Sequence, residues 1–287
     1  MQNSKTILVT GATGNQGSAA VKTLLDNGFS VKAITRDPSS AAAQNLKNLN
    51  ATVVQADLNN NSSYRDQLKD VDGIFCVLTF VNGTEKEINQ GISLVNLAKE
   101  YGVKHFIYSS VIGADLGTGI PHWESKSRIE DHLKASGLPY TIIRPVSFYE
   151  NFLLPQVKSR ILKGKLASPV KKEVMQQFIS ARDVGKTSAE IFMNPGRYLN
   201  RTITMAAEEM DMKAVASVFS EAMGKEINYQ NLPMFITRLI MGKRLHTMFK
   251  WLNEHDAVFV KDLQAFKKEY PNLTALKDWI KLNFKTT

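Results

Sequence analysis

A glycine-rich turn near the start of the chain constrains its fold more than any other feature. The segment Thr10-Gly-Ala-Thr-Gly-Asn-Gln-Gly17 follows the apolar run Thr6–Thr10 and precedes Ser18–Leu25, which has apolar residues at helical spacing. Its first glycine permits a tight turn, its second lets a pyrophosphate approach the backbone, and its third allows close packing of helix on strand. The N–H groups at the helix start, with the helix dipole, favour phosphate. The turn predicts a dinucleotide-binding unit.

The same alternation of strand and helix continues through the first half of the chain. The predicted strands are Thr6–Thr10, Ser30–Thr35, Ala51–Ala56, Gly73–Leu78, His105–Ser109 and Tyr140–Arg144. Ser18–Leu25 and Ile88–Tyr101 are predicted to be crossover helices between them. This order predicts an α/β fold with a Rossmann-type, doubly wound parallel sheet. In such sheets ligands bind beyond the carboxyl ends of the strands, so we expect Gly11, Arg36, Thr79 and Ser110 to line one crevice.

After Pro145 the pattern becomes mostly helical. The predicted helices are Ala181–Met193, Lys213–Met223, Met234–Leu252, His255–Tyr270 and Leu273–Phe284, with short extended segments at Thr202–Met205 and Glu226–Tyr229. We therefore expect a cofactor-binding domain over residues 1–150 and a smaller substrate- or partner-binding domain over residues 151–287. Because no flexible linker separates them, the second is expected to be interleaved with the first.

Composition limits the class of protein without choosing a ligand. Lysine and arginine number 36 against 27 acidic residues, and the net charge of +9 suits any anionic ligand. The single cysteine, Cys76, excludes an internal disulfide and a thiol cluster, and the histidines show no zinc-ligand spacing, so no metal is expected. No apolar run reaches the roughly 20 residues of a membrane span. The run Ile7–Val9 is too short for a signal peptide, so a cytoplasmic protein is expected.

The residue after the second predicted strand favours NADP over NAD. Folds that select NAD place an acidic residue near this point for the ribose 2′-hydroxyl, whereas an arginine accommodates a 2′-phosphate. Arg36 can pair with that phosphate and stack on the adenine. Asp37 leaves the alternative of a ribose contact open, although Ser39 and Ser40 offer further hydroxyls to the phosphate.

Asp57 directly follows the third predicted strand and is itself followed by Leu58. Both lie where contacts to the adenine side of the cofactor are made in this type of fold. Alternatively, Asp57 serves only as the cap of the next helix.

The chain as a whole resembles the NmrA-like branch of the atypical short-chain dehydrogenases. The resemblance rests on these segments: Thr10-Gly-Ala-Thr-Gly-Asn-Gln-Gly17, Arg36-Asp-Pro38, Phe106-Ile-Tyr-Ser-Ser110, His122–Lys126, Arg144-Pro145, Phe148-Tyr-Glu-Asn151 and Gly224-Lys-Glu-Ile-Asn-Tyr-Gln230. It implies cofactor contacts at Gly11, Ala12, Thr13, Gly14, Asn15, Gln16, Arg36, Thr79, Phe80, Lys126, Phe148 and Asn151. Some members of this family bind NADP(H) and act as redox-sensing regulators through protein partners, and others reduce quinones and similar compounds with NAD(P)H.

One position separates binding from catalysis in this resemblance. Active short-chain dehydrogenases use a Tyr-x-x-x-Lys pair and a serine after the preceding strand, and the lysine lowers the pKa of the tyrosine. Ser110 and Lys126 are present, but His122 occupies the tyrosine position. His122 is interpreted as a loop residue without a chemical role or as a substituted proton donor, and Lys126 as a ligand of the nicotinamide ribose.

We therefore expect an NADP(H)-binding redox sensor or regulator that acts through a protein partner. The alternative is an NADPH-dependent oxidoreductase that reduces a quinone or a similar carbonyl-type acceptor. The basic segment Met234–Lys250 is interpreted as a helix packed on the core with a solvated basic face, or as a docking surface or lid. No nucleic-acid-binding motif accompanies it, so direct nucleic-acid binding is not expected.

Overall fold

The computed structural model describes residues 4–284 and divides the chain into two compact units. The first unit contains residues 4–144 and 181–203, and the second contains residues 145–180 and 204–284. The chain therefore passes from one unit to the other three times, near residues 145, 181 and 204.

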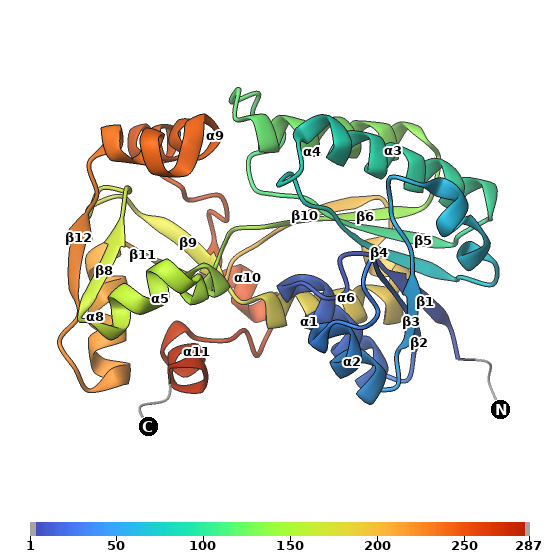
Figure 1. Ribbon diagram of the computed structural model, residues 1–287, viewed down its shortest axis with the longest axis horizontal. Coiled ribbons are helices and arrows are strands. Elements are labelled where there is room, and N and C mark those ends of the chain that lie inside the picture. Colours follow the sequence, from blue (N-terminus) through green and yellow to red (C-terminus); the bar gives the residue numbers. More distant parts are fainter. Residues whose placement is uncertain (1–3, 285–287) are drawn as a thin grey trace. The chain divides into compact units, whose positions relative to one another are not determined.

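A seven-stranded sheet forms the centre of the first unit, with the strand order β10-β6-β5-β4-β1-β2-β3 (Figure 1). Its strands are β1 Thr6–Val9, β2 Ser30–Thr35, β3 Thr52–Gln55, β4 Gly73–Val77, β5 His105–Ser109, β6 Tyr140–Pro145 and β10 Arg201–Met205. From β6 to β3 every neighbouring pair is parallel. The order runs outward in both directions from β1 and β4, which confirms the predicted doubly wound sheet.

Helices cover both faces of this sheet. They are α1 Asn15–Asp26, α2 Ala41–Asn48, α3 Thr84–Glu100, α4 Pro121–Ala135, α6 Ala181–Met193 and α7 Pro195–Tyr198, with the short 3₁₀ helices η1 Asn61–Ser63 and η2 Arg65–Leu68. Helices α3 and α4 lie on one face, and α1, α2 and α6 lie on the other (Figure 1). A Cβ atom at Gly185 of α6 would lie 2.6 Å from the carbonyl oxygen of Ala19, so α6 packs directly on the backbone of α1.

The core of the first unit follows from the apolar composition of its strands. Leu8, Ile74, Phe106 and Ile142 come from adjacent strands and are fully buried in one cluster. A parallel sheet with helices on both faces buries both sides of its strands, which explains why these strands are almost uninterrupted apolar runs in the sequence.

The second unit combines short strands with helices. Its strands are β7 Ser147–Phe148, β8 Lys165–Ser168, β9 Gln176–Ile179, β11 Glu208–Met210 and β12 Asn228–Asn231, arranged as a β11-β9-β7 sheet and a β12-β8 pair. Its helices are η3 Tyr149–Leu153, α5 Pro155–Leu162, α8 Met212–Met223, α9 Met234–Glu254, α10 Leu263–Glu269 and α11 Leu276–Asn283. Phe152, Phe219 and Trp279 are central to its own apolar cluster. In the described part of the chain no helix is both long and apolar enough to cross a membrane.

The predicted helix His255–Tyr270 is wrong in its first half. Residues 256–262 are not helical, and α10 begins only at Leu263. The buried Gln177 explains the difference: its Oε1 accepts the N–H groups of Phe259 and Val260, both at 2.9 Å, and its Nε2 donates to the carbonyl of Val260 at 2.8 Å. These bonds satisfy the backbone that a helix would have used.

His105, the first residue of β5, is buried in a single tautomer. The hydroxyl of Thr141 donates to the carbonyl of Tyr198 at 2.8 Å, so His105 Nε2, 2.8 Å from the Thr141 oxygen, carries the proton. His105 Nδ1 has no hydrogen-bond partner within residues 4–284. Burial, with a smaller contribution from the charge of Lys5, lowers the pKa of His105 to about 4.

We predict that stability falls as this histidine is forced toward its charged form. His105 takes up a proton below pH 6.5 in the unfolded chain but only below about pH 4 in the folded chain. The contribution of neutral His105 to the free energy of unfolding is therefore complete above pH 6.5 and is lost as the pH falls to 4. The loss amounts to about 3 kcal/mol. Urea unfolding at a series of pH values measures it. His105→Asn should remove this part of the pH dependence, whereas His132→Asn on α4 should retain it; equal slopes in all three proteins contradict the assignment.

Candidate functional site

Four of the predicted site residues follow strands whose carboxyl ends lie at one edge of the sheet. Gly11 follows β1, Arg36 follows β2, Thr79 follows β4 and Ser110 follows β5. These strands are parallel and contiguous in the order β5-β4-β1-β2, so the sheet brings the four positions to the same edge. This is the edge where open α/β sheets bind ligands.

The glycine turn is held by short contacts that exclude side chains. Gly11 has a φ of +57°, and a Cβ atom at Gly17 would lie 2.1 Å from the Gly11 carbonyl oxygen. The Thr10 hydroxyl donates to the carbonyl of Val77 and accepts its N–H, both at 2.9 Å. The Ser109 hydroxyl donates to Gln16 Oε1 at 2.6 Å. The turn is therefore tied to the ends of β4 and β5.

The start of α1 has the properties of an anion site. Gly14 is its N-cap and supplies no capping side chain, and the first turn contains no acidic residue. The N–H groups of that turn have no intrahelical acceptor, so they can bind an external one. Around them Thr13 and Asn15 are exposed, Gln16 is half-buried and Ala12 is buried.

Arg36 and Asp37 have different surroundings although they are neighbours. Arg36 is exposed, and its side chain makes no ion pair or hydrogen bond within the described residues. The Asp37 carboxylate accepts the hydroxyl of Ser39 at 2.5 Å and its N–H at 2.9 Å, and these bonds lower the pKa of Asp37. The Ser40 hydroxyl caps α2 by accepting the N–H of Ala43 at 3.3 Å. Asp37 thus organises its own turn, whereas the Arg36 guanidinium is available to a ligand.

Asp57 does not cap a helix. Its Oδ1 accepts the N–H and the side-chain amide of Asn59, at 2.9 and 2.8 Å, and the cap of η1 is Asn60. Leu58 is partly buried and packs on the core of the first unit. The capping interpretation of Asp57 is wrong, and the contact with the adenine side stays a prediction.

Ser110 is engaged by a buried carboxylate. Its hydroxyl donates to Glu130 Oε1 at 2.6 Å, and Arg144 donates to both oxygens of Glu130, from Nε at 2.9 Å and from Nη2 at 2.5 Å. Arg144 Nη1 also pairs with Asp115 at 2.6 Å, in the loop that follows β5. The serine that the family resemblance singles out therefore belongs to an ionic network that joins β5, β6 and α4.

Lys126 is engaged by a second buried carboxylate. Its Nζ lies 3.0 Å from Oε1 of Glu87, which is fully buried on α3, and 5.5 Å from the ring centroid of Tyr108. The Ser125 hydroxyl donates to the other oxygen of Glu87 at 2.5 Å. The ammonium charge is thereby compensated inside the protein.

His122 lies in the first turn of α4 and not in a loop, as one interpretation expected. It is buried, and its ring stacks on Phe80 with the centroids 4.5 Å apart and the planes 26° from parallel. This stacking brings the segment that follows β4 against α4. Neither Glu87 nor Glu130 was among the predicted site residues, because their roles depend on the packing of α4 against α3 and β6, which has no local sequence pattern.

Phe148 and Asn151 belong to the second unit. Phe148 ends β7 and is half-buried, and Asn151 is exposed in η3.

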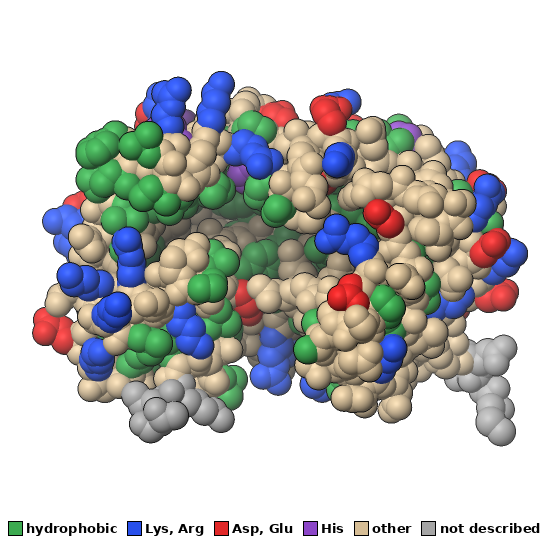
Figure 2. All heavy atoms as spheres, in the orientation of Figure 1, with side chains coloured by type: hydrophobic (Ala, Val, Ile, Leu, Met, Phe, Trp, Pro, Cys, Tyr) green, Lys and Arg blue, Asp and Glu red, His purple; other side chains and the backbone are tan. Residues whose placement is uncertain are grey.

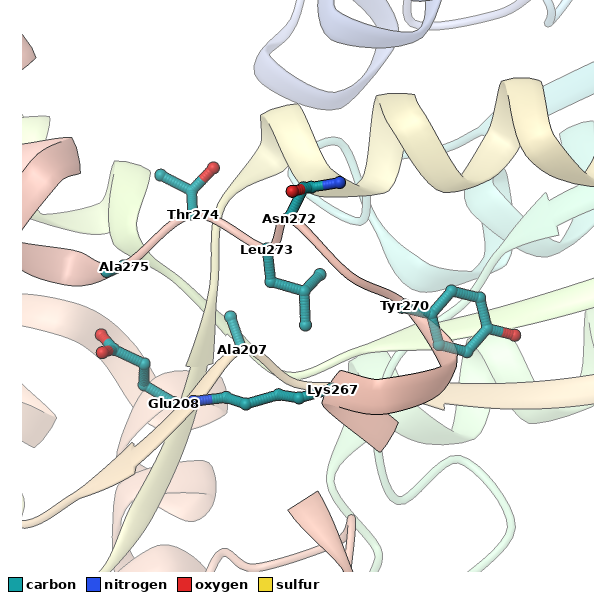
Figure 3. A pocket seen from close by; sticks show the side chains of 8 residues that line it. All are labelled: Ala207, Glu208, Lys267, Tyr270, Asn272, Leu273, Thr274 and Ala275. Carbon is teal, nitrogen blue, oxygen red and sulfur yellow. The ribbon is translucent and has the colours of Figure 1, made fainter. Parts of the chain in front are cut away.

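A cavity of about 180 Å³ in the same unit lies beside Glu208 (Figure 3), and it is lined by Ala207, Glu208, Lys267, Tyr270, Asn272, Leu273, Thr274 and Ala275. The Glu208 carboxylate accepts the Tyr149 hydroxyl at 2.9 Å and the N–H of Leu276 at 2.7 Å, so it serves to hold the start of α11. Within residues 4–284 no group of three or more His, Cys, Asp or Glu side chains is placed to hold a metal ion.

Solved structures with this fold include both regulators and reductases. NmrA, a negative transcriptional regulator in complex with NADP, matches with a TM-score of 0.80 at 22% identity over 98% of this chain and 95% of its own. An NADPH-dependent quinone oxidoreductase from Escherichia coli matches with a TM-score of 0.81 at 21% identity over 97% of this chain and 100% of its own. At these identities the likeness establishes the fold alone.

Sequence comparison establishes the family. An NmrA-like family domain-containing oxidoreductase of Malbranchea aurantiaca is 30% identical over 96% of this chain and 95% of its own. An NmrA-like family domain-containing protein of Dictyostelium discoideum is 28% identical over 98% of this chain and 99% of its own. An NAD(P)H azoreductase of Xenophilus azovorans is 29% identical over 78% of this chain and 76% of its own. The NmrA-like family model matches residues 3–280, and the chain belongs to the NmrA-like family.

Proposed function

We propose that this protein binds NADP(H) at the carboxyl edge of the first unit's sheet. The uncapped start of α1 and the glycine turn fit a pyrophosphate, because N–H groups point outward where no side chain intervenes. Thr79 and Phe80, which follow β4, would lie along the cofactor toward His122. Phe148 and Asn151 stay predicted cofactor contacts, and we assign the acceptor or partner to the second unit. The bound dinucleotide supplies a hydride or accepts one.

Arg36 supports NADP(H) over NAD(H). Its guanidinium is exposed at the end of β2 with no internal partner in the described part of the chain, and a 2′-phosphate would give it a bidentate one. The neighbouring carboxylate of Asp37 is bound by Ser39 and is turned to its own loop. Arg36 and Asp37 therefore favour a 2′-phosphate over a ribose 2′-hydroxyl at this position.

The surroundings of Ser110 and Lys126 support a sensor or regulator. Ser110 is bonded to Glu130, Lys126 is paired with Glu87, and His122 stands where the tyrosine of an active pair would be. A carbonyl acceptor needs a proton donor beside it, and these residues form no serine–tyrosine–lysine relay. Binding without carbonyl reduction is the function that this geometry supports best. The redox state of the bound cofactor would then govern association with a protein partner.

A second candidate is reduction of a quinone or similar acceptor. Solvent can protonate a delocalised oxyanion, so quinone reduction places weaker demands on a protein donor than carbonyl reduction does. The names of the related oxidoreductase and azoreductase favour this possibility.

Arg36→Ala should weaken binding of NADPH while hardly changing that of NADH. The lost charge-assisted bonds involve only the 2′-phosphate and are worth about 1.5–3 kcal/mol, or roughly 10- to 100-fold in affinity. Calorimetric titration with both cofactors measures the difference. The control is Lys99→Ala, which removes an exposed charge in the last turn of α3 and should change neither affinity. Equal losses for both cofactors in Arg36→Ala would remove Arg36 from this role.

Lys126 should contribute equally to both cofactors, because the nicotinamide ribose is common to them. The double variant Glu87→Gln/Lys126→Gln removes both charges of the buried pair, so neither is left uncompensated. We expect NADPH and NADH to bind about tenfold more weakly to it. The matched control is Glu85→Gln/Arg128→Gln, which removes an exposed pair between the same two helices, at 3.0 Å, and should bind normally. Unchanged affinity in the first variant means that Lys126 is structural only.

Turnover separates the two candidate functions. NADPH oxidation is followed at 340 nm with a panel of quinones and simple carbonyls, and we expect no carbonyl reduction. Steady quinone turnover near 1 s⁻¹ or above would show that the protein is a quinone reductase and not a pure sensor. His122→Ala should leave any quinone rate and the NADPH affinity unchanged, like the control His132→Ala on the same helix. A fall of 10²- to 10⁴-fold in His122→Ala alone, with normal binding, would identify His122 as a general acid.

A further inference from the structure

The first half of α9 exposes an apolar face to solvent. Phe235, Leu239 and Ile240 are 70%, 82% and 73% exposed, which places them among the most exposed large apolar side chains in the described residues. Phe235 and Leu239 are one helical turn apart and lie on the same face of the helix. Ile240 is about 100° further round the helix from Leu239, so it widens the exposed apolar surface at its edge. In Figure 2 apolar side chains gather over the region where Figure 1 places α9, with basic side chains beside them. We call Phe235, Leu239 and Ile240 the α9 apolar face.

The opposite side of this half-helix is anchored, so the apolar face cannot be its core side. Thr237 is buried, and its hydroxyl lies 2.6 Å from the carbonyl of Met234 and 3.0 Å from Nδ1 of His246. The helix is interrupted at Gly242, which has φ 75° and ψ 170°, and His246 lies beyond that interruption. The second half of α9 therefore holds the first half by its polar side and leaves the apolar face outward.

The charges around the α9 apolar face have one sign. Arg238, on the same half-helix, and Lys243, directly after Gly242, are exposed, and no acidic residue occurs from Leu232 to Asn253. The first carboxylate is that of Glu254 at the end of the helix, 3.9 Å from Lys250. The whole chain carries a net charge of +9. An apolar surface flanked by exposed cations, with no acidic residues among them, complements a partner that has an apolar interior and an anionic surface.

We propose that the α9 apolar face docks on an anionic lipid bilayer surface. Phe235, Leu239 and Ile240 would enter the boundary between headgroups and acyl chains, and Arg238 and Lys243 would extend to the lipid phosphates. A second copy of the chain is a poorer occupant, because pairing two such faces would bring both sets of cations together, and no carboxylate lies between Leu232 and Asn253 to compensate them. The proposal concerns attachment to the surface and is independent of cofactor binding.

Co-sedimentation of the full chain with vesicles tests the docking. We expect binding to vesicles of phosphatidylcholine with phosphatidylserine at about 0.15 M salt, little binding to phosphatidylcholine alone, and release near 1 M salt. Leu239→Gln/Ile240→Gln should lower the partition coefficient at least tenfold. Arg238→Gln/Lys243→Gln should lower it about thirtyfold. All these side chains are exposed, so the thermal unfolding midpoints should not change.

Matched variants of the same unit distinguish a local surface from general properties of the chain. Leu282→Gln removes another exposed apolar side chain, on α11, and Lys268→Gln/Lys281→Gln removes two exposed charges on α10 and α11. Both should bind vesicles like the unchanged protein. The proposal is overturned if these controls lose binding as much as the α9 variants, or if the protein ignores anionic vesicles. It is also overturned if sedimentation shows a self-association that Leu239→Gln/Ile240→Gln abolishes while vesicles are not bound.

Discussion

The packing of the first unit depends on two places where the backbone of another segment lies very close to α1. Gly17 brings the helix start against the carbonyl of Gly11, where a Cβ atom would be 2.1 Å from oxygen, and Gly185 brings α6 against Ala19. Protein interiors are close-packed and yield little to added atoms, so neither approach leaves room for a side chain. One contact shapes the turn that faces the ligand edge. The other fastens a segment from late in the chain onto the same helix.

Buried carboxylates determine what the site residues can do. Glu130 and Glu87 are almost fully enclosed, and each is neutralised by a cation and bonded to a serine. Transferring a charge from water into the protein interior is costly unless it is paired and hydrogen-bonded there. These carboxylates therefore keep their neighbouring side chains in fixed positions. Ser110 and Lys126 are thereby given fixed positions and defined partners. A lysine held in this way suits a fixed electrostatic contact better than the exchange of protons.

Local patterns in the sequence were enough to predict the glycine turn and six of the seven strands of the sheet, but β10 was expected only as an extended segment of the second domain. Strand β5, as His105–Ser109, and helix α6, as Ala181–Met193, have the bounds that their residues predict, because apolar runs and helical spacing are properties of neighbours. Helix α4 was not predicted from its spacing, since polar residues surround its few apolar anchors, Trp123, Ile129 and Leu133. The exposed Arg36 could be interpreted from its place after a strand. The partners of Ser110 and Lys126 could not, because they come from other elements.

The three passages of the chain between the units have a consequence for any shortened form of the protein. A fragment that stopped near residue 150 would contain the glycine turn and most of the sheet but would lack α6 and β10. The side of α1 against which α6 packs would meet water, and β6 would become an unprotected edge strand. Exposed apolar surface beside an open strand edge is a template for intermolecular pairing. This N-terminal half is thus expected to aggregate when it is made alone, although its sequence contains the complete glycine fingerprint.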